Sequence, residues 1–243
     1  MQVVIVKNAE QAGQAVATLI AAQIYTKPDC VLGLATGSTP IPAYQTLIGM
    51  HKEGLLDFSK VKSYNLDEYV GISYEHECSY HRFMQDELFN HVNIKPENTH
   101  VPDGNAEDIP STAAAYDAAI VAAGGIDLQL LGIGHNGHIG FNEPGSEFIY
   151  GCHKVELSQS TIEANTRFFD SEADVPRAAV TLGIGSIMNA RQVVLVATGE
   201  GKAEAVRRSL EEDVSPMCQA SILRTHPNAI FVLDEAAASK LSR

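Results

Sequence analysis

Short apolar runs alternate with stretches of helical periodicity along most of the chain. Runs of about four to eight mainly apolar residues are typical of strands buried on both faces. Such runs occupy residues 3–6, 31–34, 61–66, 126–133, 193–197 and 229–233. Helical spacing covers residues 8–25, 40–51, 79–90, 109–123 and 198–210. The alternation predicts an α/β fold of Rossmann-like type, in which an open, mostly parallel sheet carries helices on both faces.

The chain gives little sign of further subdivision. Its 243 residues contain no internal repeat, low-complexity segment or long linker, so we predict a single domain over residues 1–243. Residues 145–176 are less regular than the rest, and we expect them to form an insertion or a lid near the site.

Composition narrows the class of protein and its compartment. The formal net charge of −13, without a long basic run, disfavours nucleic acid as a partner. The N-terminal sequence has too few apolar residues for a signal peptide or a membrane span, so no membrane partner is expected. The four cysteines, at positions 30, 78, 152 and 218, form no CxxC pair. This disfavours a disulfide framework and a structural zinc site, and it favours a cytoplasmic location.

The segment LGIGHNGHIGFNEP, residues 131–144, follows the most convincing strand and carries several polar groups. In open α/β sheets, ligands bind at the carboxyl ends of the strands. Residues 132–137 match GxGxxG, but glycine and proline follow where a dinucleotide site requires a helix, so a nicotinamide oxidoreductase is disfavoured. A metal site on His135, His138 and Glu143 is disfavoured too, because a glycine loop does not align histidine rings as a helix does.

Two interpretations of His138 and Glu143 remain open on these grounds. The carboxylate can orient the imidazole as an acid/base pair, or the histidine can simply be satisfied by local backbone groups. A carboxylate is also found where the third strand ends, in NLDEY. Asp67 or Glu68 can serve there as a general base or as a plain helix cap. Because adjacent residues near a strand end point to opposite sides, we expect only one of them to face the pocket.

Three further features are suited to binding an anion. TGSTP, residues 36–40, lies between a strand and a helix, where small residues and free amides accept a phosphate; a plain turn is equally compatible. We expect Thr39 to be the N-cap and Pro40 the first helical residue. Lys202 opens a helix, against the helix dipole, and Arg167 offers a forked guanidinium, although each can also be an ordinary solvated side chain.

Taken together, ATGSTP, NLDEY, GHNGHIGFNEPG, NTRFFD and GEGKAEAVR resemble the glucosamine-6-phosphate deaminase family in order and spacing. The resemblance extends over essentially the whole chain. The related 6-phosphogluconolactonases share the fold and the glycine loop, but GFNEP and NLDEY favour the deaminase branch.

The resemblance implies a reaction without metal or organic cofactor, in which glucosamine 6-phosphate and water give fructose 6-phosphate and ammonia. It implies that Asp67 moves a proton from C2 to C1. It also implies that His138 assists opening of the sugar ring, with support from Asn136 and Glu143. The residues that it places at the phosphate are Gly37, Ser38, Thr39, Arg167 and Lys202.

The chain departs from the family pattern at two places. Many members have an acid where this chain has Asn136, and an amide cannot take up a proton as a carboxylate does, so we expect Asn136 only to orient His138. The chain ends soon after its last strand, whereas longer, hexameric members continue. We therefore expect a monomer or small homo-oligomer without activation by N-acetylglucosamine 6-phosphate. The alternatives are a sugar-phosphate lactonase on the same scaffold and a non-catalytic sugar-phosphate sensor.

Overall fold

A seven-stranded parallel sheet forms the centre of the computed structural model, which describes residues 1–242. Its strands, from one edge to the other, are β1 (Gln2–Val6), β10 (Ala229–Asp234), β9 (Gln192–Ala197), β6 (Leu128–Leu131), β2 (Val31–Leu34), β3 (Lys62–Asn65) and β5 (Thr99–His100). Every pairing in this sheet is parallel. The predicted fold class is confirmed.

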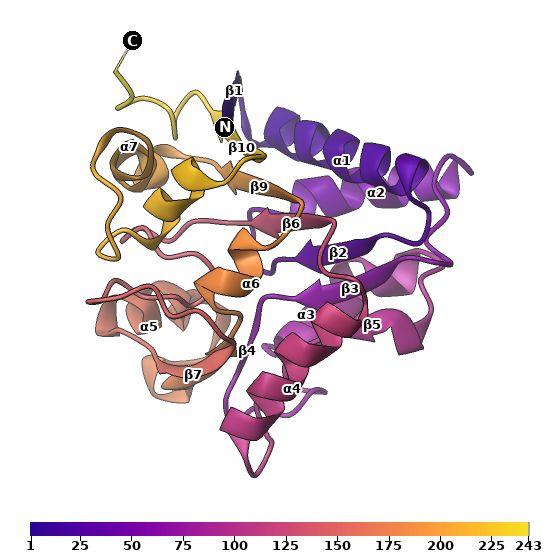
Figure 1. The fold of residues 1–243 in the computed structure, drawn as a ribbon, viewed down its shortest axis with the longest axis horizontal. Helices are drawn as coiled ribbons and strands as arrows, with labels where there is room; N and C mark the ends of the chain where they lie inside the picture. The colour runs from indigo at the N-terminus through magenta and orange to yellow at the C-terminus, as the bar shows by residue number, and fades with distance from the viewer. Residues whose placement is uncertain (243) are drawn as a thin grey trace.

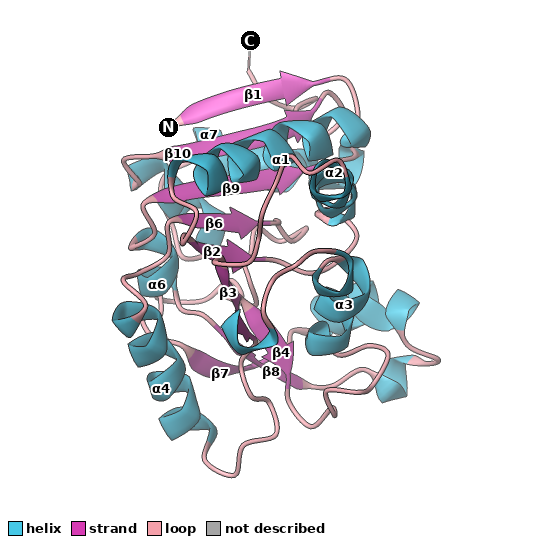
Figure 2. Cartoon of the chain, turned by 90° about the vertical axis from the view of Figure 1, so that its right-hand side faces the viewer, coloured by secondary structure: helices cyan, strands magenta, loops and turns pink. Residues whose placement is uncertain are grey.

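Helices cover both faces of this sheet. The helices of the described residues are α1 (Ala9–Thr26), α2 (Ile41–Lys52), α3 (Tyr80–Glu87), α4 (Ile109–Ala122), α5 (Gln159–Asn165), α6 (Ile184–Met188) and α7 (Ala203–Glu211). Short 3₁₀ turns are η1 (Phe89–His91), η2 (Pro96–Asn98), η3 (Thr166–Phe168), η4 (Glu172–Asp174), η5 (Glu200–Lys202) and η6 (Gln219–Thr225). In Figure 2, α1 lies in front of the strands and α7 behind them. Among the helices of residues 1–242, none combines the length and apolar character needed to cross a membrane.

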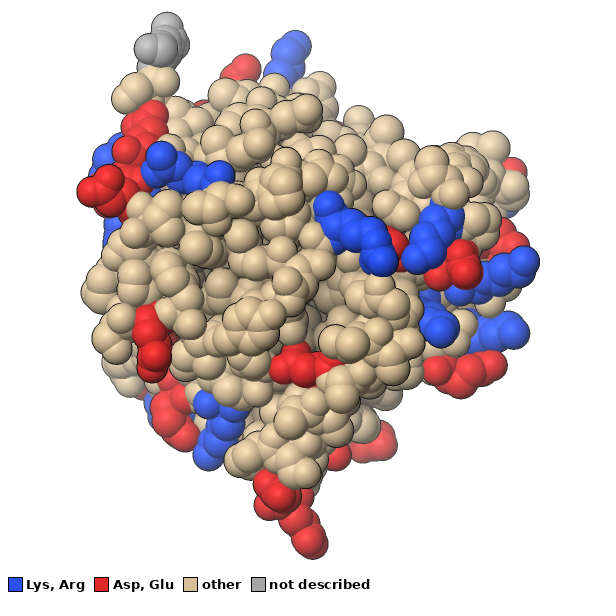
Figure 3. Space-filling model, in the orientation of Figure 1, with Lys and Arg blue, Asp and Glu red and all other residues tan. Residues whose placement is uncertain are grey.

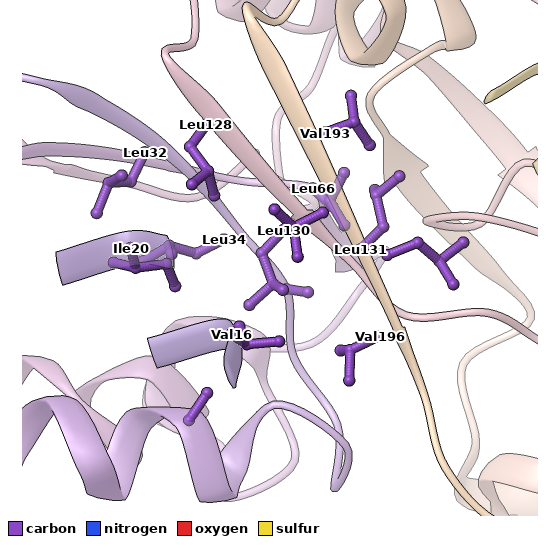
Figure 4. Packing of buried hydrophobic residues seen from close by; sticks show 14 of the residues in the cluster. Val16, Ile20, Leu32, Leu34, Leu66, Leu128, Leu130, Leu131, Val193 and Val196 are labelled. Carbon is purple, nitrogen blue, oxygen red and sulfur yellow. The ribbon is translucent and has the colours of Figure 1, made fainter. Parts of the chain in front are cut away.

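The main core lies between α1 and the central strands. Helix α1 begins at Asn8, whose side-chain oxygen accepts a hydrogen bond from the Gln11 amide at 2.9 Å, as the sequence predicts. Val16 and Ile20 of this helix lie beside Leu34 and Leu130 of the sheet (Figure 4). Full burial of one such side chain contributes about 1.5–3 kcal/mol, so this layer fixes the positions of the central strands.

A second, three-stranded antiparallel sheet lies beside the first. Its strands are β4 (Asp67–Tyr69), β8 (Ala178–Thr181) and β7 (His153–Glu156). β4 follows β3 after a single residue, Leu66, and belongs to the small sheet, so the predicted strand at 61–66 matches β3 and ends before β4. The segment 145–176, expected to be less regular, contains β7 and α5 and packs Leu157 and Ile162 into a second, small core, which it shares with Tyr69 of β4 and with Phe141. Its role as a lid stays a prediction.

Several sequence-based boundaries differ from the structure. Thr39 is not the N-cap of α2, because Pro40 occupies that position with helical dihedral angles and no side chain caps the helix. The hydroxyl groups before α2 are therefore free of a capping role. The strand predicted at 126–133 is limited to the four residues Leu128–Leu131. The predictions missed six short elements that show no clear period, namely β4, β5, β7, β8, α5 and α6.

The chain leaves two neighbouring central strands in opposite directions. β2 is followed by β3 on one side, whereas β6 is followed along the sheet by β9 on the other. Loops that part in this way open a crevice at the carboxyl ends of the strands. The arrowheads of β2, β6 and β9 point to the same side in Figure 1, where α5 and α7 lie. This crevice is the position that the fold offers to a ligand.

Candidate active site

A cavity of about 790 Å³ occupies this crevice. The loops after β2, β3, β6 and β9 line it from the sheet, and α5 and η3 line it from the opposite side. The predicted site residues that line it are Gly37, Ser38, Thr39, Asp67, Asn136, His138, Arg167 and Lys202. Glu143 is the exception, since it does not line the cavity and instead lies beside the His138 ring. The fold thus brings residues from five separate segments to one place.

Asp67 is held at the first position of β4, where the chain passes from the large sheet to the small one. Its side chain is buried, with 6 % of the residue exposed, and it lines the cavity. Burial, together with the nearby charge of Glu68, raises the pKa of the Asp67 carboxyl to about 8. A carboxyl with a pKa near the working pH is suited to both accept and return a proton.

Glu68 points the opposite way, as strand alternation predicts. Its carboxylate accepts hydrogen bonds from the backbone amides of Tyr69 (2.9 Å), Tyr80 (3.0 Å) and His81 (2.9 Å). Two of these amides belong to the first turn of α3, where free N–H groups favour an anion. Burial raises the pKa of Glu68, and these bonds oppose that shift. Glu68 therefore anchors α3, and of these two adjacent acids only Asp67 lines the cavity.

His138 and Glu143 form the predicted pair, with Asn136 as a third member. Nδ1 of His138 lies 3.6 Å from Oε2 of Glu143, an ion-pair distance, and has no hydrogen-bond partner. The Asn136 amide donates to the same Oε2 at 2.7 Å, and Oδ1 of Asn136 accepts from the His138 backbone amide at 3.1 Å. Burial raises the pKa of Glu143, but His138, Thr161 and Asn136 outweigh it and lower the pKa to about 2.

Glycines in the loop after β6 allow the His138 ring to pack closely against the backbone. A Cβ atom on Gly134 would lie 2.3 Å from Cε1 of His138, so only glycine allows the imidazole to lie against the backbone there. Gly137 has a φ of 90°, a left-handed conformation that other residues rarely adopt. The GxGxxG-like spacing therefore serves the histidine and the turn, and no helix follows it.

The other oxygen of Glu143 is bound by residues that sequence reasoning missed. Oε1 accepts hydrogen bonds from Ser158 Oγ at 3.2 Å and from Thr161 Oγ1. Ser158 is the N-cap of α5, and the chain continues from α5 into η3, which carries Arg167. No spacing rule links Glu143 to residues 15 and 18 positions further along, since the contact depends on the tertiary fold. Glu143 thus joins His138 to the segment that carries Arg167.

Lys202 and Arg167 supply positive charge at the cavity. The Lys202 ammonium donates to the Ile133 carbonyl at 2.7 Å and, within residues 1–242, has no carboxylate within ion-pair distance. Burial, together with the Arg167 charge, lowers the pKa of Lys202 to about 8. Arg167 lies 4.6 Å over the ring of Phe168. Two cations brought close together form a site that favours an anion.

His135 also lines the cavity, although it was considered only as a metal ligand at the sequence level. Its pKa is lowered first by the charge of Lys202, and further by burial, His138 and Arg167. Within residues 1–242, no three His, Cys, Asp or Glu side chains are grouped in a way that could hold a metal ion.

Comparison with known proteins places the chain in a family. The family model described as glucosamine-6-phosphate isomerases/6-phosphogluconolactonase matches residues 6–231. The chain belongs to this family. The resemblance to glucosamine-6-phosphate deaminases that the sequence motifs indicate is confirmed by this match and by the relatives described next.

Named members of the family match this chain over nearly its full length. A glucosamine-6-phosphate deaminase of Clostridioides difficile (strain 630) is 51% identical over 242 residues, which cover 100% of this chain and 97% of that protein. A glucosamine-6-phosphate deaminase of Shewanella woodyi is 50% identical and covers 100% and 92%. A solved structure described as a monomeric glucosamine-6-phosphate deaminase superposes with a TM-score of 0.96 at 42% identity, covering 98% and 99%. A 6-phosphogluconolactonase of Leishmania guyanensis shares the fold, with a TM-score of 0.78 at 23% identity.

Proposed function

We propose that the protein is a glucosamine-6-phosphate deaminase, which converts glucosamine 6-phosphate and water to fructose 6-phosphate and ammonia. The observation that carries the proposal is the buried carboxyl of Asp67 in the same cavity as a cationic site and an imidazole–carboxylate pair. A lactonase needs no base at C2, so this carboxyl favours the deaminase. The identity of about half with named deaminases supports the same assignment.

In the proposed reaction, the His138 pair opens the sugar ring. Nδ1 of His138 faces Glu143, which leaves Nε2 as the nitrogen for the substrate. Nε2 takes the proton of the C1 hydroxyl group and gives one to the ring oxygen, so that the ring C–O bond breaks and an aldehyde forms. The ionised Glu143 stabilises the imidazolium that exists between these two transfers. Asn136 holds Glu143 through its amide N–H group and neither takes up nor releases a proton during the reaction.

Asp67 then moves one proton along the open chain. The aldehyde acidifies the hydrogen on C2, and ionised Asp67 removes it while the ammonium group of the substrate gives a proton to O1, so that a neutral enol-amine forms. Asp67 then gives its proton to C1, which leaves a hydroxyl at C1 and an iminium at C2. Water adds to the iminium carbon, a proton passes from this water to the nitrogen, ammonia leaves, and the ketone of fructose 6-phosphate remains. Acid/base groups of this kind typically contribute ~10²–10⁴-fold each.

The cationic end of the cavity holds the phosphate in this proposal. Lys202 and Arg167 provide the charge, and Gly37, Ser38 and Thr39 provide backbone amides and hydroxyl groups that are free of a capping role. Anchoring one end of the chain positions C1 and C2 for the base. Contact-range donors also allow a protein of net charge −13 to bind an anion, because its other charges are screened beyond about 10 Å.

We also infer the setting in which the enzyme works. The substrate is a small sugar phosphate, and we propose neither nucleic acid nor a membrane as a partner. On the face shown in Figure 3, Lys and Arg lie among Asp and Glu and form no extended basic surface. All four cysteines are free thiols, which supports the cytoplasm. The similarity to a structure described as monomeric supports a monomer or small assembly.

Ammonia release from glucosamine 6-phosphate, measured without added metal or nucleotide, tests the proposal. We expect turnover by the wild type and none by Asp67→Asn. The same preparation is also offered 6-phosphogluconolactone, whose hydrolysis releases acid but no ammonia. Acid release from the lactone without ammonia release from the amino sugar would assign the protein to the lactonases and overturn the proposal.

A further inference from the structure

His135 is close to the two loops that form the cationic end of the cavity. It belongs to the loop after β6, yet its ring reaches the loop after β9, since a Cβ on Gly201 would lie 3.3 Å from Nε2 of His135. Lys202 is the next residue after Gly201. The imidazole is therefore placed beside the Lys202 segment, at the cavity and not within the protein core.

The charged groups that shift the pKa of this imidazole are cationic or can become so, and the nearby Glu143 carboxylate is bound to the side chains of Asn136 and His138. Lys202 comes from η5, Arg167 from η3, and His138 from the same loop, and all three lower the pKa of His135. A fourth cation, Arg208 of α7, reaches the neighbouring Asn136 carbonyl at 3.4 Å. His135 accepts a proton with difficulty in such surroundings, and an arriving dianion reverses the field that it experiences.

We infer that His135 is a third phosphate-binding side chain, which becomes protonated when the phosphate of the substrate enters the cavity. This inference rests on the proposed function, because it assigns the phosphate end of that same site. The neutral imidazole avoids repulsion between close cations in the free enzyme. Once a dianion lies among them, the protonated ring adds a third positive charge and an N–H donor at Nε2.

A measurable proton uptake follows. At pH 7 a phosphate monoester is mostly dianionic, because its second pKa is about 6. Lys202 is mostly charged at this pH, because its pKa is about 8. Any difference in proton uptake between the wild type and a His135 variant therefore belongs to His135. The probe is glucitol 6-phosphate, an open-chain sugar phosphate that cannot be deaminated.

The test is isothermal titration calorimetry at pH 7 in two buffers of different ionisation enthalpy, which gives the protons taken up per ligand. We expect a substantial fraction of one proton for the wild type, and a smaller value for His135→Gln. His135→Gln should bind glucitol 6-phosphate roughly 5- to 10-fold more weakly than the wild type at pH 6.5. The two proteins should bind it with equal affinity at pH 8.5. His135→Arg, with a fixed charge, should restore affinity without the proton uptake. The matched control is His91→Gln, an exposed histidine outside the cavity, which should leave both values unchanged.

Each outcome decides the inference. Equal proton uptake by the wild type and His135→Gln, or equal affinity at pH 6.5, would overturn it. The resonance of the His135 ring proton, followed by NMR with and without glucitol 6-phosphate, gives the same answer without a variant: its apparent pKa should rise on binding, and a fixed pKa is contrary to the inference. If the wild type releases no ammonia, the proposed function fails instead, so the two failures are distinguishable.

Discussion

Replacement of Asp67 by asparagine should abolish turnover and at the same time stabilise the folded chain. Asparagine has the shape of the neutral carboxyl and carries no charge into a position where only 6 % of the residue is exposed. For an acid whose pKa is higher in the folded chain, the folded state holds more protons between the two values. Stability therefore falls as pH rises through that window.

The size of the effect follows from the Asp67 pKa of about 8, against an ordinary value of 3.8. Since one pKa unit corresponds to about 1.4 kcal/mol, ionisation of Asp67 in the unfolded chain lowers the stability of the fold by on the order of 5 kcal/mol near pH 7.5 and about 2 kcal/mol at pH 5. The free energy of unfolding that Asp67→Asn gains over the wild type should thus be about 3 kcal/mol smaller at pH 5 than at pH 7.5. For a chain of this length, that is a change of roughly 6–12 °C in the difference between the two melting temperatures.

Thermal unfolding of both proteins by circular dichroism at pH 5, 6 and 7.5 checks this, beside the ammonia assay. The control is Asp127→Asn, because Asp127 is equally buried but accepts hydrogen bonds from Lys27 and the Val31 amide, both at 2.8 Å. That variant should be less stable than the wild type at pH 7.5. A stability gain in Asp67→Asn that does not depend on pH would refute the reasoning about the buried charge, and retained turnover would refute Asp67 as the base. The raised pKa also predicts that kcat/KM of the wild type rises with pH until about 8.

Three further substitutions test other parts of the site. Gly134→Ala puts a Cβ 2.3 Å from the His138 ring and should lower kcat roughly 100-fold through misplacement of the imidazole; unchanged kcat would contradict the seating described. Thr161→Val removes a hydrogen-bond donor to Glu143 and should slow turnover of the closed sugar roughly 10-fold. Thr161→Ser keeps the hydroxyl group and should retain most of the activity. Equal rates for the two variants would show that this hydrogen bond does not contribute to turnover. Lys202→Ala should raise KM roughly 10-fold with little change in kcat, and steady-state kinetics showing an unchanged KM would remove it from the phosphate site.

The sequence predicted the large sheet well because its strands are buried on both faces. β2, β9 and β10 are continuous apolar runs whose positions need no tertiary information. The small sheet was not predictable in this way. The residues of β7 alternate between half-buried and exposed, and the strand pairs with a partner 25 residues away, so its signal is hardly different from that of a loop.

The site was predicted in part for similar physical reasons. Motifs at strand ends, such as NLDEY and GHNGH, could be placed because strand ends meet at one edge of a parallel sheet. The resemblance to a family supplied the roles. Neither the motifs nor the resemblance pointed to Thr161 as a partner of Glu143, or to His135 as a neighbour of Lys202, since both contacts depend on how distant loops fold together. Thr39 was wrongly placed as a helix cap because Pro40 adopts helical angles one residue later.

The shared carboxylate of Glu143 limits how this enzyme can be altered. One oxygen faces the imidazole and the other holds the start of α5, so the ring-opening group and the arginine-bearing segment are mechanically joined. An engineer who repacks residues 158–167 to admit a bulkier sugar would change the rate of ring opening along with substrate choice. Variants in this segment are therefore best selected for both properties at once.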